Sequence, residues 1–90
     1  MILDLDKNLL NLKGAPLPEK LSDILANMLA MATEGPPAKM MTWAVNLTNS
    51  GEIEVERSDV NFLIQFIEKN NNVVNLAKDQ LLKELEALKE

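Results

Sequence analysis

The sequence predicts a mostly helical α+β fold, in which an N-terminal β-hairpin packs with four helices in one domain spanning residues 1–90. Four stretches place apolar residues three and four positions apart, as one face of a helix requires, and Pro, Gly or Asn clusters separate them. Two shorter stretches alternate apolar and polar residues, as half-buried strands do. The chain is 47% hydrophobic but only 3% aromatic, so the core is expected to be aliphatic.

The hairpin is expected over residues 2–12. Its strands are residues 2–5 and 9–12, and the turn between them, Asp-Lys-Asn, has suitable side chains. Because two strands alone are marginal in water, the hairpin needs the helices or a third strand. Residues 52–56 offer that strand, since Ile53 and Val55 face one side and the intervening glutamates face the other.

The first helix is expected over residues 18–33. Pro18 suits the first turn, where its missing N–H is not needed, and Glu19 complements the positive end of the helix dipole. Gly35 and Pro36 then end the helix. Its apolar stripe comprises Leu21, Ile24, Leu25, Met28, Leu29 and Ala32.

The second helix is expected over residues 37–49, with Pro37 early in its first turn. Two adjacent rows of side chains make its apolar face wide, so the helix is predicted to be mostly buried. One row contains Met40, Trp43, Ala44 and Leu47, and the other contains Met41, Val45 and Thr48.

The third helix is expected over residues 59–70, with Ser58 as its N-cap. Its stripe of Val, Leu and Ile side chains is widened by Phe62 and Phe66 to more than half of the circumference. A helix this apolar is either central in the fold or makes an intermolecular contact.

The fourth helix is expected over residues 73–89, with Asn72 as its cap. Asp79 and Lys83 form an i, i+4 pair in the favourable orientation. One side of the helix carries Val74, Ala77, Leu81, Leu85 and Leu88. The predicted core of the whole domain comprises Leu25, Leu29, Trp43, Leu47, Leu63, Ile67, Leu81 and Leu85.

Composition argues against several classes of function. The chain has no Cys and no His, so it lacks disulfides, thiolate ligands, the commonest general base and the commonest metal ligand. The Ser and Thr hydroxyls therefore have no imidazole partner for nucleophilic catalysis. We predict a non-enzymatic protein with no catalytic residues, no metal ligands, no cofactor and no small-molecule substrate.

Charge and hydropathy indicate which partners the chain can bind and where in the cell it is located. The net charge is −5, and the single arginine, Arg57, lies among acidic residues, which disfavours binding to nucleic acid. The N-terminus is acidic without a continuous apolar core, unlike a signal peptide. The chain contains no apolar run of 18 residues, so no membrane segment is expected. The expected location is the cytoplasm.

Residues 46–57 resemble the loop of an EF-hand, with Gly51 at its turn position and Ile53 at its hydrophobic position. Calcium needs several carboxylates, including a bidentate glutamate that closes the loop, whereas Arg57 occupies the closing position here. The resemblance therefore implies helix–loop–strand–helix geometry more than calcium binding. The first, third and fifth loop positions hold Asn46, Thr48 and Ser50.

The opening of the chain carries a second resemblance. Residues 1–6 and 9–12 form a hydrophobic and Asp-containing strand pair, residues 13–17 read Lys-Gly-Ala-Pro-Leu, and residues 25–29 read Leu-Ala-Asn-Met-Leu. This order resembles a class of small proteins encoded in tailed phages and prophages. The resemblance implies a phage-type origin, the cytoplasm of a bacterial host, and an assembly, accessory or regulatory role.

The leading hypothesis is a protein that acts through protein–protein contacts, either with a partner protein or by self-association. Phe62, Phe66 and Leu82 are the candidate contact residues, because they lie on the wide apolar faces of the third and fourth helices. One alternative is a regulator that touches nucleic acid, which the acidic charge opposes. Another is a divalent-ion-binding helix–loop–helix module at residues 46–57.

Overall fold

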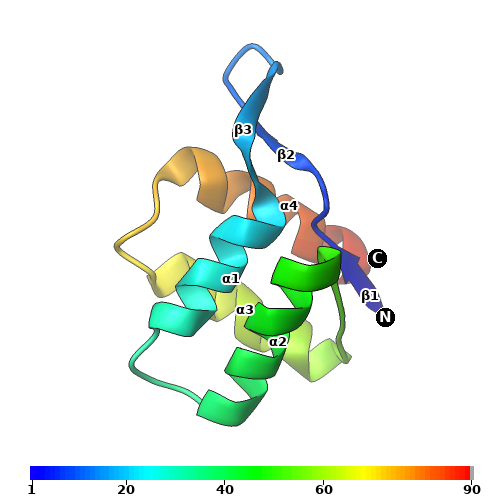
Figure 1. Ribbon diagram of the computed structural model, residues 1–90, viewed down its shortest axis with the longest axis vertical. Coiled ribbons are helices and arrows are strands. Elements are labelled where there is room, and N and C mark those ends of the chain that lie inside the picture. The colour runs from blue at the N-terminus through cyan, green and yellow to red at the C-terminus, as the bar shows by residue number, and fades with distance from the viewer. Residues whose placement is uncertain (90) are drawn as a thin grey trace.

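The computed structural model describes residues 1–89 and confirms the α+β class (Figure 1). The strands are β1 (Ile2–Asp4), β2 (Asn8–Leu10), β3 (Pro16–Lys20) and β4 (Glu52–Glu54). The helices are α1 (Leu21–Met31), α2 (Pro37–Ser50), α3 (Arg57–Lys69) and α4 (Asn75–Lys89). Helix α1 packs mainly against α2, and α3 packs mainly against α4. The molecule measures 36 × 28 × 25 Å.

The strands form two separate antiparallel pairs, β1 with β4 and β2 with β3. An N-terminal hairpin is therefore present, but the expected pairing of residues 2–5 with 9–12 is wrong. In the observed register Leu3 lies opposite Ile53. Pairing β1 with β4 gathers four buried aliphatic side chains in one layer, which a hairpin of residues 2–12 could not do. These four are Leu3, Leu5, Ile53 and Val55.

The backbone hydrogen bonds of Leu5 fix the turn between β1 and β2. Its N–H donates to the Gly51 carbonyl at 2.8 Å, and its own carbonyl accepts from the N–H groups of Lys7 at 2.8 Å and Ser22 at 3.0 Å. Leu5 is fully buried. The turn at residues 5–7 is thus tied to the end of α2 and the start of α1, and β2 begins beyond it.

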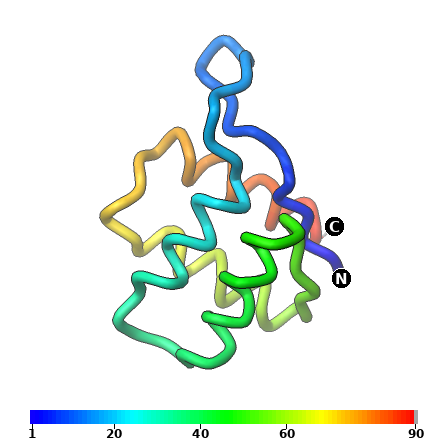
Figure 2. The backbone as a smooth tube through the Cα atoms, in the orientation of Figure 1, coloured from blue at the N-terminus to red at the C-terminus, as the bar shows by residue number. Residues whose placement is uncertain are grey.

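The β2–β3 hairpin, with the turn that joins its strands, projects from one end of the long axis of the molecule (Figures 1 and 2). We call residues 8–18 the arm. The expected start of the first helix at residue 18 is wrong, because Pro18 belongs to β3 and α1 begins at Leu21. At the two ends of β3, the Ala15 carbonyl accepts from the Asn11 N–H at 2.8 Å and the Leu21 N–H donates to the Lys7 carbonyl at 2.9 Å. Pro16 and Pro18 alternate with these positions, so their missing N–H groups fall on the outer edge of the strand.

Gln80 of α4 holds the arm in place. The N–H of Leu10 donates to Gln80 Oε1 at 2.9 Å, and Gln80 Nε2 donates to the Leu10 carbonyl at 2.7 Å. The side-chain amide thereby satisfies both backbone groups of Leu10, as a neighbouring strand would. A bulge in β2 between Asn8 and Leu10 accompanies this contact.

The connection from α2 to α3 is built around two termini. Gly51 ends α2 with a φ of 77°, and its N–H donates to the Leu47 carbonyl at 2.9 Å. Helix α3 begins at Arg57, so the predicted N-cap, Ser58, is wrong. The cap position is Glu56, whose N–H donates to Asp59 Oδ2 at 2.9 Å. The Asp59 carboxylate reaches back to the cap from the third helical position and also pairs with Lys39.

Two helical faces are less buried than expected. Met41 and Val45 on α2 are 45% and 50% exposed, whereas the row that contains Trp43 is buried. The prediction that α2 is mostly buried is therefore wrong for its second row. Helix α4 begins at Asn75, after the expected start at residue 73, so Val74 precedes the helix and is 67% exposed. The predicted Asp79–Lys83 pair is confirmed at 2.9 Å.

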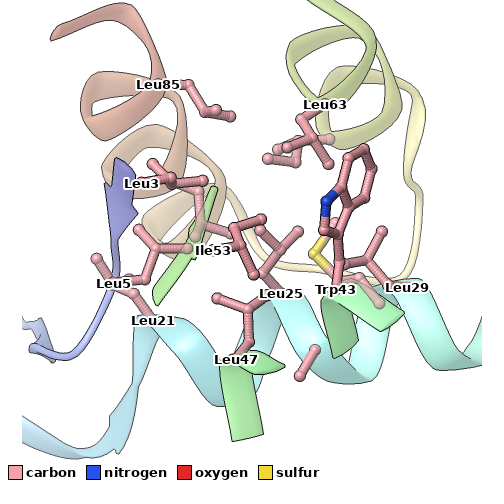
Figure 3. Packing of buried hydrophobic residues seen from close by; sticks show 14 of the residues in the cluster. Leu3, Leu5, Leu21, Leu25, Leu29, Trp43, Leu47, Ile53, Leu63 and Leu85 are labelled. Atoms are coloured by element: carbon pink, nitrogen blue, oxygen red, sulfur yellow. The ribbon is translucent and has the colours of Figure 1, made fainter. Parts of the chain in front are cut away.

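The core lies between the four helices and the β1–β4 pair, and all eight predicted core residues are buried. In Figure 3, Trp43 lies beside Leu29 and Leu63, while Leu3 and Leu5 approach Ile53 below Leu85. The Trp43 and Phe62 ring centroids are 6.2 Å apart, so aromatic contact continues from the core toward the outer face of α3.

Candidate functional site

A groove of about 920 Å³ opens on one side of the molecule. Helices α1 and α3 form its walls, and residues 32–35 and 70–74, the two loops on the left in Figure 2, form its ends. We call it the α1–α3 groove. Ile24 and Met28 contribute to its apolar lining from α1, and Val73 and Ala77 contribute from the region where α4 begins.

Two stacked aromatic rings line the α3 side of the groove. Phe62 and Phe66 are one turn apart on α3, so their side chains share a face. Their ring centroids are 6.2 Å apart and their planes differ by 7°. Both residues are half-buried, and Phe62 also packs against Trp43 of the core. The rings therefore present an apolar surface to the groove, and Trp43 packs against Phe62 from the core side.

Met31 and Val74 flank the groove as exposed apolar residues. Met31 ends α1 and is 81% exposed, and Val74 is 67% exposed. Both line the groove together with the aromatic rings. Leaving such side chains in water forgoes the free energy that their burial supplies, so a covering surface would stabilise them.

The polar part of the groove consists mostly of amides. Asn27 and Gln65 come from the two helices, and residues 70–72 add three asparagines. Charged groups on the lining are the carboxylates of Glu19 and Glu34 and the ammonium of Lys69. This mixture of aromatic anchors, exposed aliphatic side chains and hydrogen-bonding amides suits contact with an apolar segment of another protein.

The structure separates the three predicted contact residues. Phe62 and Phe66 come together on the α1–α3 groove. Leu82 lies on α4, half-buried against the core, and is not part of the groove lining. The prediction missed Met31 and Val74. Met31 stands outside the regular apolar stripe of its helix, a signal that it is not a core residue.

A second, shallower hollow of about 280 Å³ lies between α1 and α2. Met41 and Val45 line it from α2, with Ala26 and Ala30 opposite on α1. It lacks aromatic side chains, so its exposed residues are matched controls for those of the groove.

Among the residues described, Asp59 is the one carboxyl group whose pKa is lowered, and it lies outside the α1–α3 groove. Hydrogen bonds from Lys39 and from the Glu56 N–H hold the pKa of Asp59 below its ordinary value of 3.8. The Lys39 pair joins α2 to the first turn of α3 and the Glu56 bond caps α3, so both causes of the lowered pKa are structural.

The segment that resembles an EF-hand is partly helical. Residues 46, 48 and 50 lie within α2. The Thr48 hydroxyl donates to the Ala44 carbonyl and the Ser50 hydroxyl donates to the Asn46 carbonyl, both at 2.9 Å. Over residues 1–89, no group of three or more acidic side chains is arranged to hold a metal ion.

Comparisons with family models, with curated proteins and with solved structures find no match to this chain. Across residues 1–89, every helix is too short or too polar to cross a membrane.

Proposed function

We propose that this chain is a non-enzymatic protein that acts through protein–protein contacts, and that the α1–α3 groove is its binding surface. One observation carries the proposal: the strongly exposed Met31 and Val74 flank a groove lined by the stacked rings of Phe62 and Phe66. Apolar surface of this kind, bordered by polar groups, is typical of protein interaction sites.

The shape of the groove favours a partner protein over a small molecule. Pockets for small ligands enclose most of the ligand surface. Here Met31 and Val74, which are 81% and 67% exposed, line an open groove, where a broad partner surface covers them better. The asparagines of residues 70–72 supply donors and acceptors for the backbone of a bound segment.

The resemblance to small proteins of tailed phages supports the biological side of the proposal. We assign the chain an assembly, accessory or regulatory role of phage type, carried out in the cytoplasm of a bacterial host. Such a role requires binding specificity and no chemistry by the protein itself.

Affinity capture with paired variants tests the proposal. The groove variant combines Met31→Lys with Val74→Asp. Both positions are strongly exposed, a lysine suits the last turn of α1, and an aspartate suits the position before α4. The control variant places the same two changes, Met41→Lys and Val45→Asp, in the α1–α2 hollow. Both variants leave the net charge unchanged.

The tagged chain is expressed in its native cell, and captured proteins are identified by mass spectrometry. We expect at least one protein to be retained by the unmodified chain and by the control variant but lost from the groove variant. Equal capture by all three chains would show that the groove is not the binding surface for a different protein. Far-UV circular dichroism and thermal unfolding check that both variants are folded.

A further inference from the structure

The tip of the arm is an exposed apolar knob on a rigid support. Leu12 is 95% exposed. Asn11 fixes the turn around it, because its Oδ1 accepts from the N–H groups of Lys13 at 2.9 Å and Ala15 at 3.0 Å. Gly14 completes the turn with a φ of 85°. The conformation that exposes Leu12 is thus held by specific hydrogen bonds.

No other part of the same molecule covers Leu12. Gln80 anchors Leu10 to α4, and the arm projects beyond the helices (Figure 1). The asparagine side chain at residue 8 adds a bond to the Leu17 carbonyl at 2.7 Å. Covering Leu12 within the same chain would break these contacts, so only a second molecule can bury it.

Charge distinguishes the arm from the rest of the chain. Residues 8–18 contain one lysine, Lys13, and no acidic residue, so the remaining residues carry a net charge of −6. Lys13 takes part in no ion pair formed within residues 1–89. On the α1–α3 groove, the carboxylates of Glu19 and Glu34 outnumber the ammonium of Lys69. A positive, apolar tip and an acidic, apolar groove are complementary.

We propose that the arm tip of one molecule binds in the α1–α3 groove of a second copy of this chain, with Leu12 against the aromatic rings and Lys13 facing the groove carboxylates. The inference rests on the proposed function, because it uses the same groove and names its occupant. Tip and groove are different surfaces, so each copy offers one of each and the contact is heterologous. A contact this small predicts weak association.

Nuclear magnetic resonance of the full chain tests the contact. In a dilution series that reaches millimolar concentration, backbone amide shifts of residues 11–15 should change together with those of residues 31–35 and 70–74. Leu12→Ser should weaken association at least about tenfold, because the buried leucine is lost. Lys13→Glu should weaken it about two- to fivefold. The α2 control variant, Met41→Lys with Val45→Asp, should associate like the unmodified chain.

Mixing two defective variants provides the sharper test. The Leu12→Ser chain keeps its groove, and the groove variant, Met31→Lys with Val74→Asp, keeps its tip. Each alone should show much smaller concentration-dependent shifts than the unmodified chain in the same dilution series. In the mixture, isotope-labelled Leu12→Ser should shift only at its groove, and the labelled groove variant should shift only at its tip.

Two results would overturn the inference: spectra of the unmodified chain that stay constant up to millimolar concentration, or a mixture of the two variants in which neither labelled chain shifts. Well-dispersed spectra of each variant establish that it is folded. If these results occur while groove-dependent capture of another protein persists, the second copy is the wrong occupant and the proposed function stands. Loss of groove-dependent capture alone would instead remove only a hetero-partner.

Discussion

Gly51 and Asp6 approach so closely that a side chain at Gly51 has no room. A Cβ built on Gly51 would lie 2.6 Å from the Cβ of Asp6 and 3.1 Å from its Cα. Gly51 also has a φ of 77°, which L-residues rarely adopt. The contact joins the end of α2 to the turn that follows β1, so it brings two distant parts of the sequence together.

Gly51→Ala is expected to destabilise the fold by both effects. The left-handed conformation costs about 1 kcal/mol and the clash with the Asp6 backbone adds about 1–3 kcal/mol. Gly14→Ala is the matched control, because Gly14 has a φ of 85° but nothing within 4 Å of its added Cβ. Urea unfolding measures both free energies of unfolding. Equal losses in the two variants would show that the contact with Asp6 relaxes freely.

Gln80→Ala is expected to loosen the arm. The variant loses the two hydrogen bonds between the Gln80 amide and the Leu10 backbone, at a cost of about 0.5–1 kcal/mol because the site is solvent-exposed. Hydrogen exchange of the Leu10 amide should therefore accelerate. Glu86→Ala, an exposed change on the same helix, is the control. Unchanged exchange at Leu10 would contradict the anchoring role of Gln80.

Asp59→Asn is expected to lower stability at neutral pH by about 1 kcal/mol and to reduce its dependence on acid. The folded pKa of Asp59 lies below 3.8, so the unfolded chain binds its proton first as the pH falls. The contribution is therefore complete well above pH 3.8 and is lost as the pH falls through the folded pKa. Urea unfolding between pH 7 and pH 2 measures it. A difference between wild type and variant that stays constant over this range would be inconsistent with the lowered pKa.

Leu25→Ala is expected to cost about 2–5 kcal/mol, because Leu25 is fully buried and the change leaves a cavity. That loss is a large part of the roughly 5–15 kcal/mol by which domains are stable. Leu12→Ala removes the same atoms from a side chain that is 95% exposed, so it should leave thermal unfolding of the monomer unchanged. Similar losses at both positions would contradict the assignment of core and surface.

The helices and the core were predictable because their signals are local. Apolar residues spaced three and four apart define one face of a helix wherever the helix packs, and Gly51 or Pro36 interrupts the chain whatever surrounds it. The eight predicted core residues accordingly are all buried. The helix starts were less accurate, because Pro18 fits a strand edge as well as a first turn, and Asp59 displaces Ser58 from the capping role.

Part of the candidate groove was predictable for the same reason. Phe62 and Phe66 widen the apolar face of α3 beyond what one packing partner covers, which is why the sequence predicted them as candidate contact residues. Met31 and Val74 join them only because the segments that follow α1 and precede α4 both border the groove. Met31 is the last residue of α1 and Val74 immediately precedes α4, so their exposure depends on the positions of these two helix ends.

The sequence by itself determined the four helices, their buried stripes and the two faces of β1 and β4, one buried and one exposed. Only the tertiary structure decided which strands pair, because alternation fixes the face that a strand buries and not its partner. Leu3 and Leu5 could face the core in either pairing. The partner 50 residues away is used because Ile53 and Val55 complete the same buried layer, a gain that exists only in the folded tertiary structure.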